Sequence, residues 1–317
     1  MKLPLFFLIL FLLGLSACES LVTEVGPESL PDTESKLVVQ SFISPQASRI
    51  VVVVTESAPL FGESSGNLHI VKNAIVKISD GSREATIRYD STGSSYSIDR
   101  TRFNIVAGKT YQLSVTDGTR SVRATCIVPL KTVNVKNYVI DTVYSENAFN
   151  PDTTITVKMT WDDIVGEPNF YRLRSNLELE YTVIEGDSPE NFKERRVRNR
   201  FNVDWDRSIG RNDFRSDVNL DGTAFSSPIG RYTLPAPMTY QHKDGTIHTV
   251  YPKSKIISLT FEVDNTDETY YKYHRSLQLR NTDNPFSEPA LIYSNIVDGL
   301  GCFAAYNAGF VTYKPVQ

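Results

Sequence analysis

The chain has 317 residues, with 33 Lys and Arg against 37 Asp and Glu, and its formal net charge is −4. A mildly acidic chain without a long basic stripe argues against nucleic acid as the main partner. Aromatic residues are frequent, with 16 Tyr and 16 Phe but only 2 Trp. β-Branched residues cluster in short runs, so the composition favours an all-β protein.

The first residues predict a bacterial lipoprotein. A short basic start precedes an apolar run over residues 3–15, and Ser16 and Ala17 lead directly into Cys18. This order is typical of a signal peptide (residues 1–17), and the run is short for a permanent membrane span. Leu-Ser-Ala-Cys fits a lipobox, in which cleavage between Ala17 and Cys18 leaves a diacylated Cys18 as the anchor. The alternative is an ordinary secretory signal with an incidental cysteine.

Residues 18–36 form an acidic stretch with two prolines and little apolar periodicity. Such a composition cannot bury a core, so we predict a flexible tether. The tether would hold a globular body away from the membrane surface. The acyl chains of the anchor would bind the membrane with roughly 0.8 kcal/mol per buried methylene.

Residues 37–130 predict an immunoglobulin-like β-sandwich. Seven short β runs with turn signals between them have the size and rhythm of that fold. Tyr111 lies where a tyrosine corner would, although a plain core tyrosine is the alternative. The predicted strands cover residues 36–44, 48–57, 73–80, 83–90, 95–99, 110–117 and 120–129.

Residues 131–317 predict a second β-rich domain with one helix. The helix is expected near 267–280, with Asn265 or Thr266 as its N-cap. Tyr270, Tyr273, His274 and Leu277 would share its apolar side, which makes His274 a packing residue rather than a catalytic one. The expected strands cover residues 132–140, 153–161, 170–184, 195–205 and 255–264.

The C-terminal part resembles a known family. NPFSEP (284–289), IYSNI (292–296), GLG (299–301) and AYN (305–307) follow one another in the order of the signature of the Bacteroidota lipoproteins called domain of unknown function 4249. Looser similarity runs through KLVVQSFIS, GKTYQLSV and PNFYRLR. The resemblance implies an outer-membrane lipoprotein, often encoded beside a TonB-dependent receptor. It supplies no catalytic residues.

Two short motifs suggest chemistry. GESSG (62–66) matches a nucleophile elbow around Ser64, but no helix follows it, so we interpret the stretch as an exposed loop. Asp217, Asn219 and Asp221 match the first half of a calcium loop. Pro228 stands where a bidentate Glu is needed, so calcium would require another ligand, for which Asp213 is a candidate. The alternative is a polar β-turn.

His242 and His248 flank a hairpin whose two-residue Asp-Gly turn would place them on opposite faces. They would then not share a metal, and no zinc motif is present.

Three arginines, Arg196, Arg198 and Arg200, would share one strand face and could contact an anion. The alternative is a solvated face neutralised by acids such as Asp204 and Asp206.

Cys126 and Cys302 could pair, but we favour two buried free thiols.

The sequence therefore predicts a non-enzymatic, membrane-anchored accessory of a TonB-dependent receptor in the outer membrane. It predicts no cofactor other than the candidate calcium, and it leaves the leaflet open. The alternative is a stand-alone carbohydrate- or peptide-binding module. Trp161 and Trp205 distinguish the two, because exposed aromatics in a groove favour ligand binding and buried ones favour a scaffold.

Overall fold

The computed structural model describes residues 34–57, 69–147, 150–206, 213–280 and 291–315. Within these ranges the protein is mainly β, as predicted, with one α-helix. The predicted signal peptide, the lipid-anchor residue Cys18, all of the tether except 34–36, and Ser64 lie outside the described residues.

All seven strands predicted for residues 37–130 are present. They pair in the order β1-β2-β5-β4-β3-β6-β7 and enclose one apolar core. The immunoglobulin-like assignment stays a prediction, and the sets β1-β2-β5-β4 and β3-β6-β7 are compatible with it. Their bounds are β1 Leu37–Ile43, β2 Arg49–Glu56, β3 Ile75–Ser79, β4 Glu84–Asp90, β5 Ser95–Asp99, β6 Thr110–Thr116 and β7 Ser121–Ile127.

Tyr111 occupies the corner that its position in the sequence suggests. Its ring is buried, and its hydroxyl accepts a hydrogen bond from the Val106 N–H at 2.7 Å. A buried phenol that bonds to backbone a few residues upstream is the tyrosine corner of β-sandwiches.

The second unit consists of two β layers. One continues the large sheet through β11-β10-β18-β19, with β13 on β10, and the other contains β12-β15-β9-β14 with β8 on β9. Trp161, Tyr171, Phe225 and Phe261 fill the space between them. The bounds are β8 Val135–Asn147, β9 Asn150–Asp162, β10 Phe170–Glu185, β11 Lys193–Asn202, β12 Asp204–Trp205, β13 Phe214–Ser216, β14 Ala224–Ser226, β15 Gly230–Thr233, β18 Lys255–Thr266 and β19 Leu300–Tyr313.

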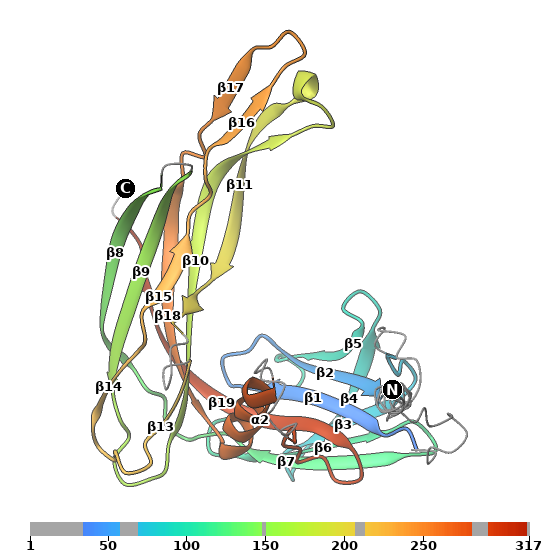
Figure 1. Cartoon of the computed structure of the whole chain (residues 1–317). Coiled ribbons are helices and arrows are strands. Elements are labelled where there is room, and N and C mark those ends of the chain that lie inside the picture. Colours follow the sequence, from blue (N-terminus) through green and yellow to red (C-terminus); the bar gives the residue numbers. More distant parts are fainter. Residues whose placement is uncertain (1–33, 58–68, 148–149, 207–212, 281–290, 316–317) are drawn as a thin grey trace, which may run out of the picture.

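An arm extends from this unit. The far ends of β10 and β11, the 3₁₀ turn Pro189–Asn191 and the hairpin of β16 (Met238–Gln241) and β17 (Ile247–Val250) project beyond both cores (Figure 1). The hairpin has no buried side chain.

Strand β19 belongs to both units. Its first half runs parallel to β1, from Val38 opposite Leu300 to Ile43 opposite Ala305. Its second half runs antiparallel to β18, starting with Thr266 opposite Tyr306. The predicted division at residue 130 assigns all of β19 to the second unit, whereas residues 300–305 pair with the first.

The predicted helix is present as α2, Glu268–Arg280, and Tyr270 and Tyr273 are buried on its inner side as expected. The predicted N-cap is wrong. Asp267 caps the helix, since its Oδ1 accepts the Tyr270 N–H at 2.7 Å and its Oδ2 accepts the Ala305 N–H at 2.9 Å. The two oxygens of a carboxylate satisfy the helix end and β19 at once, while the Asn265 amide donates to the Lys131 carbonyl oxygen.

Two glycines of β19 permit close backbone packing. A Cβ on Gly301 would lie 2.1 Å from the Val39 carbonyl oxygen, and a Cβ on Gly309 would lie 1.9 Å from the Val133 carbonyl oxygen. These contacts attach β19 to β1 and to the segment that joins the units.

We expect Gly301→Ala to lower the free energy of unfolding by more than about 2 kcal/mol, because the methyl group would overlap the β1 backbone. Gly118→Ala is the matched control: its φ of +101° is close to the +107° of Gly301, but nothing lies within 4 Å of its Cβ. It should cost about 1 kcal/mol, from backbone conformation alone. Urea denaturation measures both, and equal losses would contradict the overlap.

Candidate functional site

A pocket lined by charged and aromatic side chains lies where the two units meet. It has a volume of about 700 Å³ and receives side chains from β1, β10, β11, α2 and β19. We call it the arginine cleft. Its characteristic residues are Phe42, Arg172, Arg174, Arg200, Trp205, Asp213, Glu262, Tyr270, His274 and Tyr306.

Aromatic rings support the arginines of the cleft. The Arg172 guanidinium lies 5.3 Å from the centroid of the Phe214 ring and 5.6 Å from that of Tyr270. The Arg174 guanidinium lies 4.9 Å from the centroid of Tyr306. Cation–π contacts of this kind hold a planar guanidinium in place.

Carboxylates neutralise part of this charge. Arg174 Nε lies 2.9 Å from Oδ2 of the fully buried Asp264. Arg172 Nε lies 3.8 Å from Asp213 Oδ2 and makes no hydrogen bond within the described residues. This Nε atom is itself buried, so a ligand in the cleft could not reach it, and Arg172 Nη1 donates to the Tyr270 hydroxyl.

His274 is enclosed by rings. It stacks on Phe214 with ring centroids 5.6 Å apart, and Phe42 lies 4.9 Å away. Burial, together with a smaller contribution from the nearby Arg172 and Arg174 charges, lowers the pKa of His274 to about 3. The side chain is therefore neutral at pH 7, which suits the packing role predicted for it.

The row of arginines on β11 is largely paired. Arg196 Nη2 lies 2.7 Å from Glu180, and Arg198 Nε lies 2.8 Å from Glu178. The neutralising acids come from the neighbouring strand β10 rather than from Asp204 and Asp206. Among the described residues Arg200 forms no ion pair within 4.0 Å, and it faces the arginine cleft. It is the member of the row best placed to contact an anion.

The predicted faces of His242 and His248 are wrong. His242 pairs with Thr246 through its backbone, and Tyr240 lies opposite His248. The loop is therefore one residue longer than predicted and includes Gly245 at a φ of +87°. One extra residue reverses the face, so the two imidazole centroids lie 4.7 Å apart on one side.

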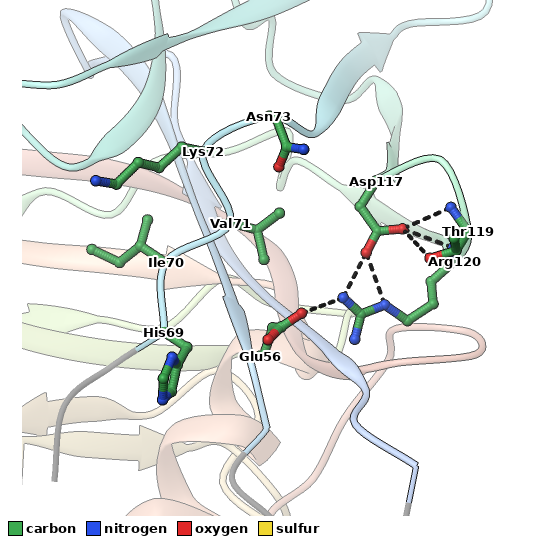
Figure 2. Close-up of a pocket in the computed structure, with 9 residues that line it drawn as sticks. All are labelled: Glu56, His69, Ile70, Val71, Lys72, Asn73, Asp117, Thr119 and Arg120. Atoms are coloured by element: carbon green, nitrogen blue, oxygen red, sulfur yellow. Dashed lines mark hydrogen bonds and ion pairs between the residues drawn. The ribbon is translucent and has the colours of Figure 1, made fainter. Parts of the chain in front are cut away.

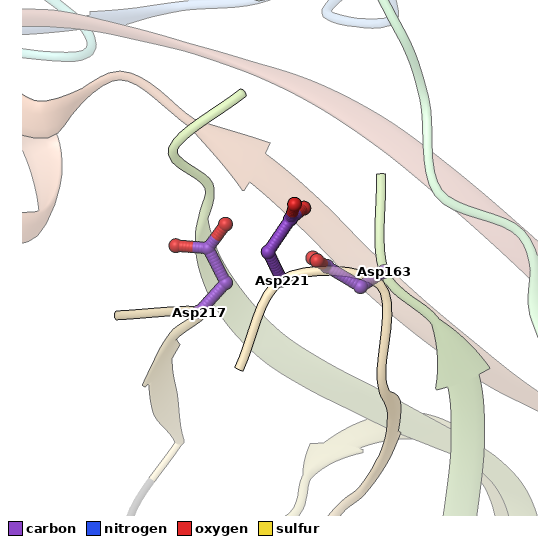
Figure 3. Close-up of side chains that lie close together, drawn as sticks. All are labelled: Asp163, Asp217 and Asp221. Carbon is purple, nitrogen blue, oxygen red and sulfur yellow. The ribbon is translucent and has the colours of Figure 1, made fainter. Parts of the chain in front are cut away.

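The acidic motif converges with a residue that sequence reasoning missed. Asp217 and Asp221 lie beside Asp163, which follows the end of β9 (Figure 3). The suggested extra ligand, Asp213, is instead near Arg172 and accepts a hydrogen bond from Gln278. No sequence pattern relates Asp163 to a loop 54 residues later; only the pairing of β9 with β14 does so.

Another pocket, of about 680 Å³, lies beside the end of β2 (Figure 2). The Arg120 guanidinium, which lines this pocket, forms ion pairs with Glu56 and with Asp117, and Asp117 Oδ2 lies 2.6 Å from Arg120 Nη2. Arg120 also donates to the Ser35 carbonyl oxygen at 3.0 Å. These bonds fix the end of β2, the β6–β7 turn and residue 35 to one another, which is a structural role.

Cys126 and Cys302 are free and buried, as favoured. Burial raises the pKa of both thiols. A buried protonated thiol is a poor nucleophile and metal ligand. Within the described ranges, no helix has the length and apolarity needed to cross a membrane.

The architecture is thus that of a two-unit β protein whose units share one strand. The family described as Domain of unknown function (DUF4249) matches residues 22–309, and the chain belongs to this family. No curated protein matches.

Two solved structures are distantly similar. A "Biofilm associated protein - BSP domain" has 10% identity and a TM-score of 0.17 over 94% of this chain and 62% of its own. The C-terminal globular domain of an oligosaccharyltransferase from Pyrococcus abyssi has 11% identity and a TM-score of 0.13 over 89% and 47%. The chain spans less than two thirds of the length of either structure.

The pKa of His274 predicts a pH dependence. The pKa of about 3 in the folded state lies below the ordinary 6.5. Below about pH 6.5 the histidine is therefore protonated in the unfolded chain but stays neutral in the folded chain. This contribution to stability is present above that pH and is lost as pH falls towards 3, by at most about 1.4 kcal/mol per pH unit.

The variant His274→Phe should remove this slope, because a phenyl ring does not titrate. It breaks no hydrogen bond of Nε2, which has no partner within the described residues. Urea denaturation between about pH 7 and 4.5 compares the two proteins. Parallel pH profiles would contradict the neutral, buried histidine.

Proposed function

We propose that the protein is a non-enzymatic, lipid-anchored accessory of a TonB-dependent receptor in the outer membrane, where it takes part in nutrient capture. The lipobox that ends in Cys18 supports the anchor, and the family resemblance supports the receptor as partner. The proposal leaves open which face of the membrane carries the protein.

The arm is the observation that carries the proposal. Its hairpin of β16 and β17 contributes no buried side chain, yet Met238 and Ile247 on it are 53% and 67% exposed, and Tyr251 follows at 61%. Apolar side chains that stabilise no core of their own gain most when a partner removes them from water. An arm held clear of both cores can reach such a partner (Figure 1).

Both tryptophans favour a scaffold over an open aromatic platform. Trp161 is 0% exposed and Trp205 is 7% exposed, with its Nε1–H donating to the Leu173 carbonyl oxygen. The non-enzymatic assignment has a separate basis. Among the described residues no histidine side chain hydrogen-bonds a serine or cysteine, which is the contact that activates a nucleophile.

The test is co-purification from the native host of the tagged full chain in mild detergent, with the bound proteins identified by mass spectrometry. A TonB-dependent receptor should co-purify in stoichiometric amount. The double variant Met238→Asp, Ile247→Asp should reduce the recovered receptor by about tenfold, since the two side chains lie on opposite faces of the hairpin and the variant places a charge on each face. Cys18→Ala should release the protein from the membrane.

Ile75→Asp is the matched control. The side chain of Ile75 is 54% exposed, nearly the same fraction as the 53% of Met238. Because Ile75 lies on β3 in the other unit, this variant should retain the receptor. A wild-type protein that is membrane-bound yet purifies without a receptor would overturn the accessory role. A receptor retained equally by the arm variant would overturn the arm as the contact.

The arginine cleft favours a second candidate, a stand-alone module that binds carbohydrate or peptide. The exposed Arg200, which forms no ion pair within 4.0 Å among the described residues, and the adjacent rings suit a ligand with carboxylate or hydroxyl groups. Trp205 lines the cleft, so binding should change its fluorescence in a screen of glycans and acidic peptides. Arg200→Gln should weaken any such binding by about tenfold, the cost of one charged hydrogen bond.

A further inference from the structure

Three carboxylates converge at the end of the second unit that faces away from the arm. Asp163, Asp217 and Asp221 each offer one oxygen, and these oxygens lie within 4.8 Å of one another (Figure 3). Asp217 and Asp221 come from the loop after β13, and Asp163 follows β9. Asp217, Asn219 and Asp221 also line an open pocket of about 390 Å³.

Asp217 is the informative member, because its residue is only 5% exposed and yet its carboxylate has no hydrogen bond or ion pair from any described residue. The other two carboxylates are tied in place. Asp163 accepts bonds from the Tyr171 hydroxyl at 2.5 Å and the Gly222 N–H at 2.8 Å, and Asp221 accepts the Gly166 N–H at 2.9 Å. A largely buried carboxylate that lies against two others and has no partner of its own is stabilised by a bound cation.

No lysine or arginine within the described ranges supplies this positive charge. None lies within 4.0 Å of the three carboxylates, and Lys131 near the pocket is already paired with Glu167 at 3.1 Å. Tyr171 donates its hydroxyl proton to Asp163 but carries no positive charge.

The geometry fits one hard cation. Ca²⁺ binds oxygens at about 2.3–2.6 Å, so two oxygens on the same ion lie at most about 5 Å apart. The observed limit of 4.8 Å meets this condition. Gly222 stands at the sixth position of the motif, where a calcium loop has its turn glycine, and has a φ of +73°.

We propose that Asp163, Asp217 and Asp221 form a Ca²⁺ site, with water filling the positions that open on the pocket. Asp163 supplies the acidic ligand that Pro228 cannot. The ion would join the β13–β14 loop to the end of β9 and so fasten one end of the second unit. The site is independent of any receptor contact at the arm.

The test uses the full chain in mild detergent after treatment with a chelator. Isothermal titration with Ca²⁺ should show one site with a Kd of about 10⁻⁴–10⁻³ M, the range of extracellular calcium modules. Tb³⁺ should bind competitively and luminesce on excitation of Trp161, whose ring centroid lies 5.9 Å from that of Tyr171, the residue bonded to Asp163.

Asp217→Asn and Asp221→Asn should each weaken binding by at least about tenfold, since each removes one charged ligand. Asp221 is exposed, so its variant folds even if the buried Asp217→Asn does not. Asp162→Asn is the control: it neighbours Asp163 but is exposed and paired with Lys136, and it should bind like the wild type. Absence of binding at millimolar Ca²⁺, unchanged binding in Asp221→Asn, or a preference for Mg²⁺ would overturn the proposal.

Discussion

The division of β19 between two partners is the constraint on which the rest of the structure depends. Residues 300–305 add a parallel strand to the first unit, and residues 306–313 add an antiparallel strand to the second. A single extended strand cannot bend freely between its halves, so the hydrogen bonds on each side fix the relative orientation of two β units. The strand changes partner between the adjacent residues Ala305 and Tyr306, and this point sets how the two units are oriented.

Side chains around this interval attach the remaining connections. The Asn307 amide donates to the Pro129 and Leu130 carbonyl oxygens, and Asn265 donates to that of Lys131, so the segment between the units lies against β18 and β19. Asp267 holds α2 to Ala305. Burial raises the pKa of Asp267 to about 7, against the pull of the Tyr270 and Ala305 N–H groups. The junction therefore includes a carboxylate whose ionisation is costly, and the arginine cleft forms where α2, β1 and β10 are brought together beside it.

Local pattern predicted most of the elements but not their partners. The seven strands of the first unit, the strands β8, β9, β10, β11 and β18 of the second and the apolar side of α2 follow from periods of two and 3.6 residues, which need no distant contact. Strand β19 is not among the predicted strands. The parallel pairing of β19 with β1 joins residues more than 250 positions apart, and no local signal encodes it. The same holds for Asp163, which reaches the acidic loop only through folding. The prediction that His242 and His248 lie on opposite faces was wrong for a different reason: one additional loop residue reverses the face of a side chain.

The C-terminal residues that resemble the family signature have structural roles wherever the structure describes them. Within IYSNI, the Asn295 side chain bonds to both backbone groups of Phe303 and to the Thr125 carbonyl oxygen, which joins the segment to β19 and β7. GLG contains Gly301 against β1, and AYN spans the point where β19 changes partner. A signature of this kind specifies the junction between the units. Membership of the family therefore transfers the architecture, whereas specificity must come from surfaces that the junction only positions: the arm, the arginine cleft and the acidic loop.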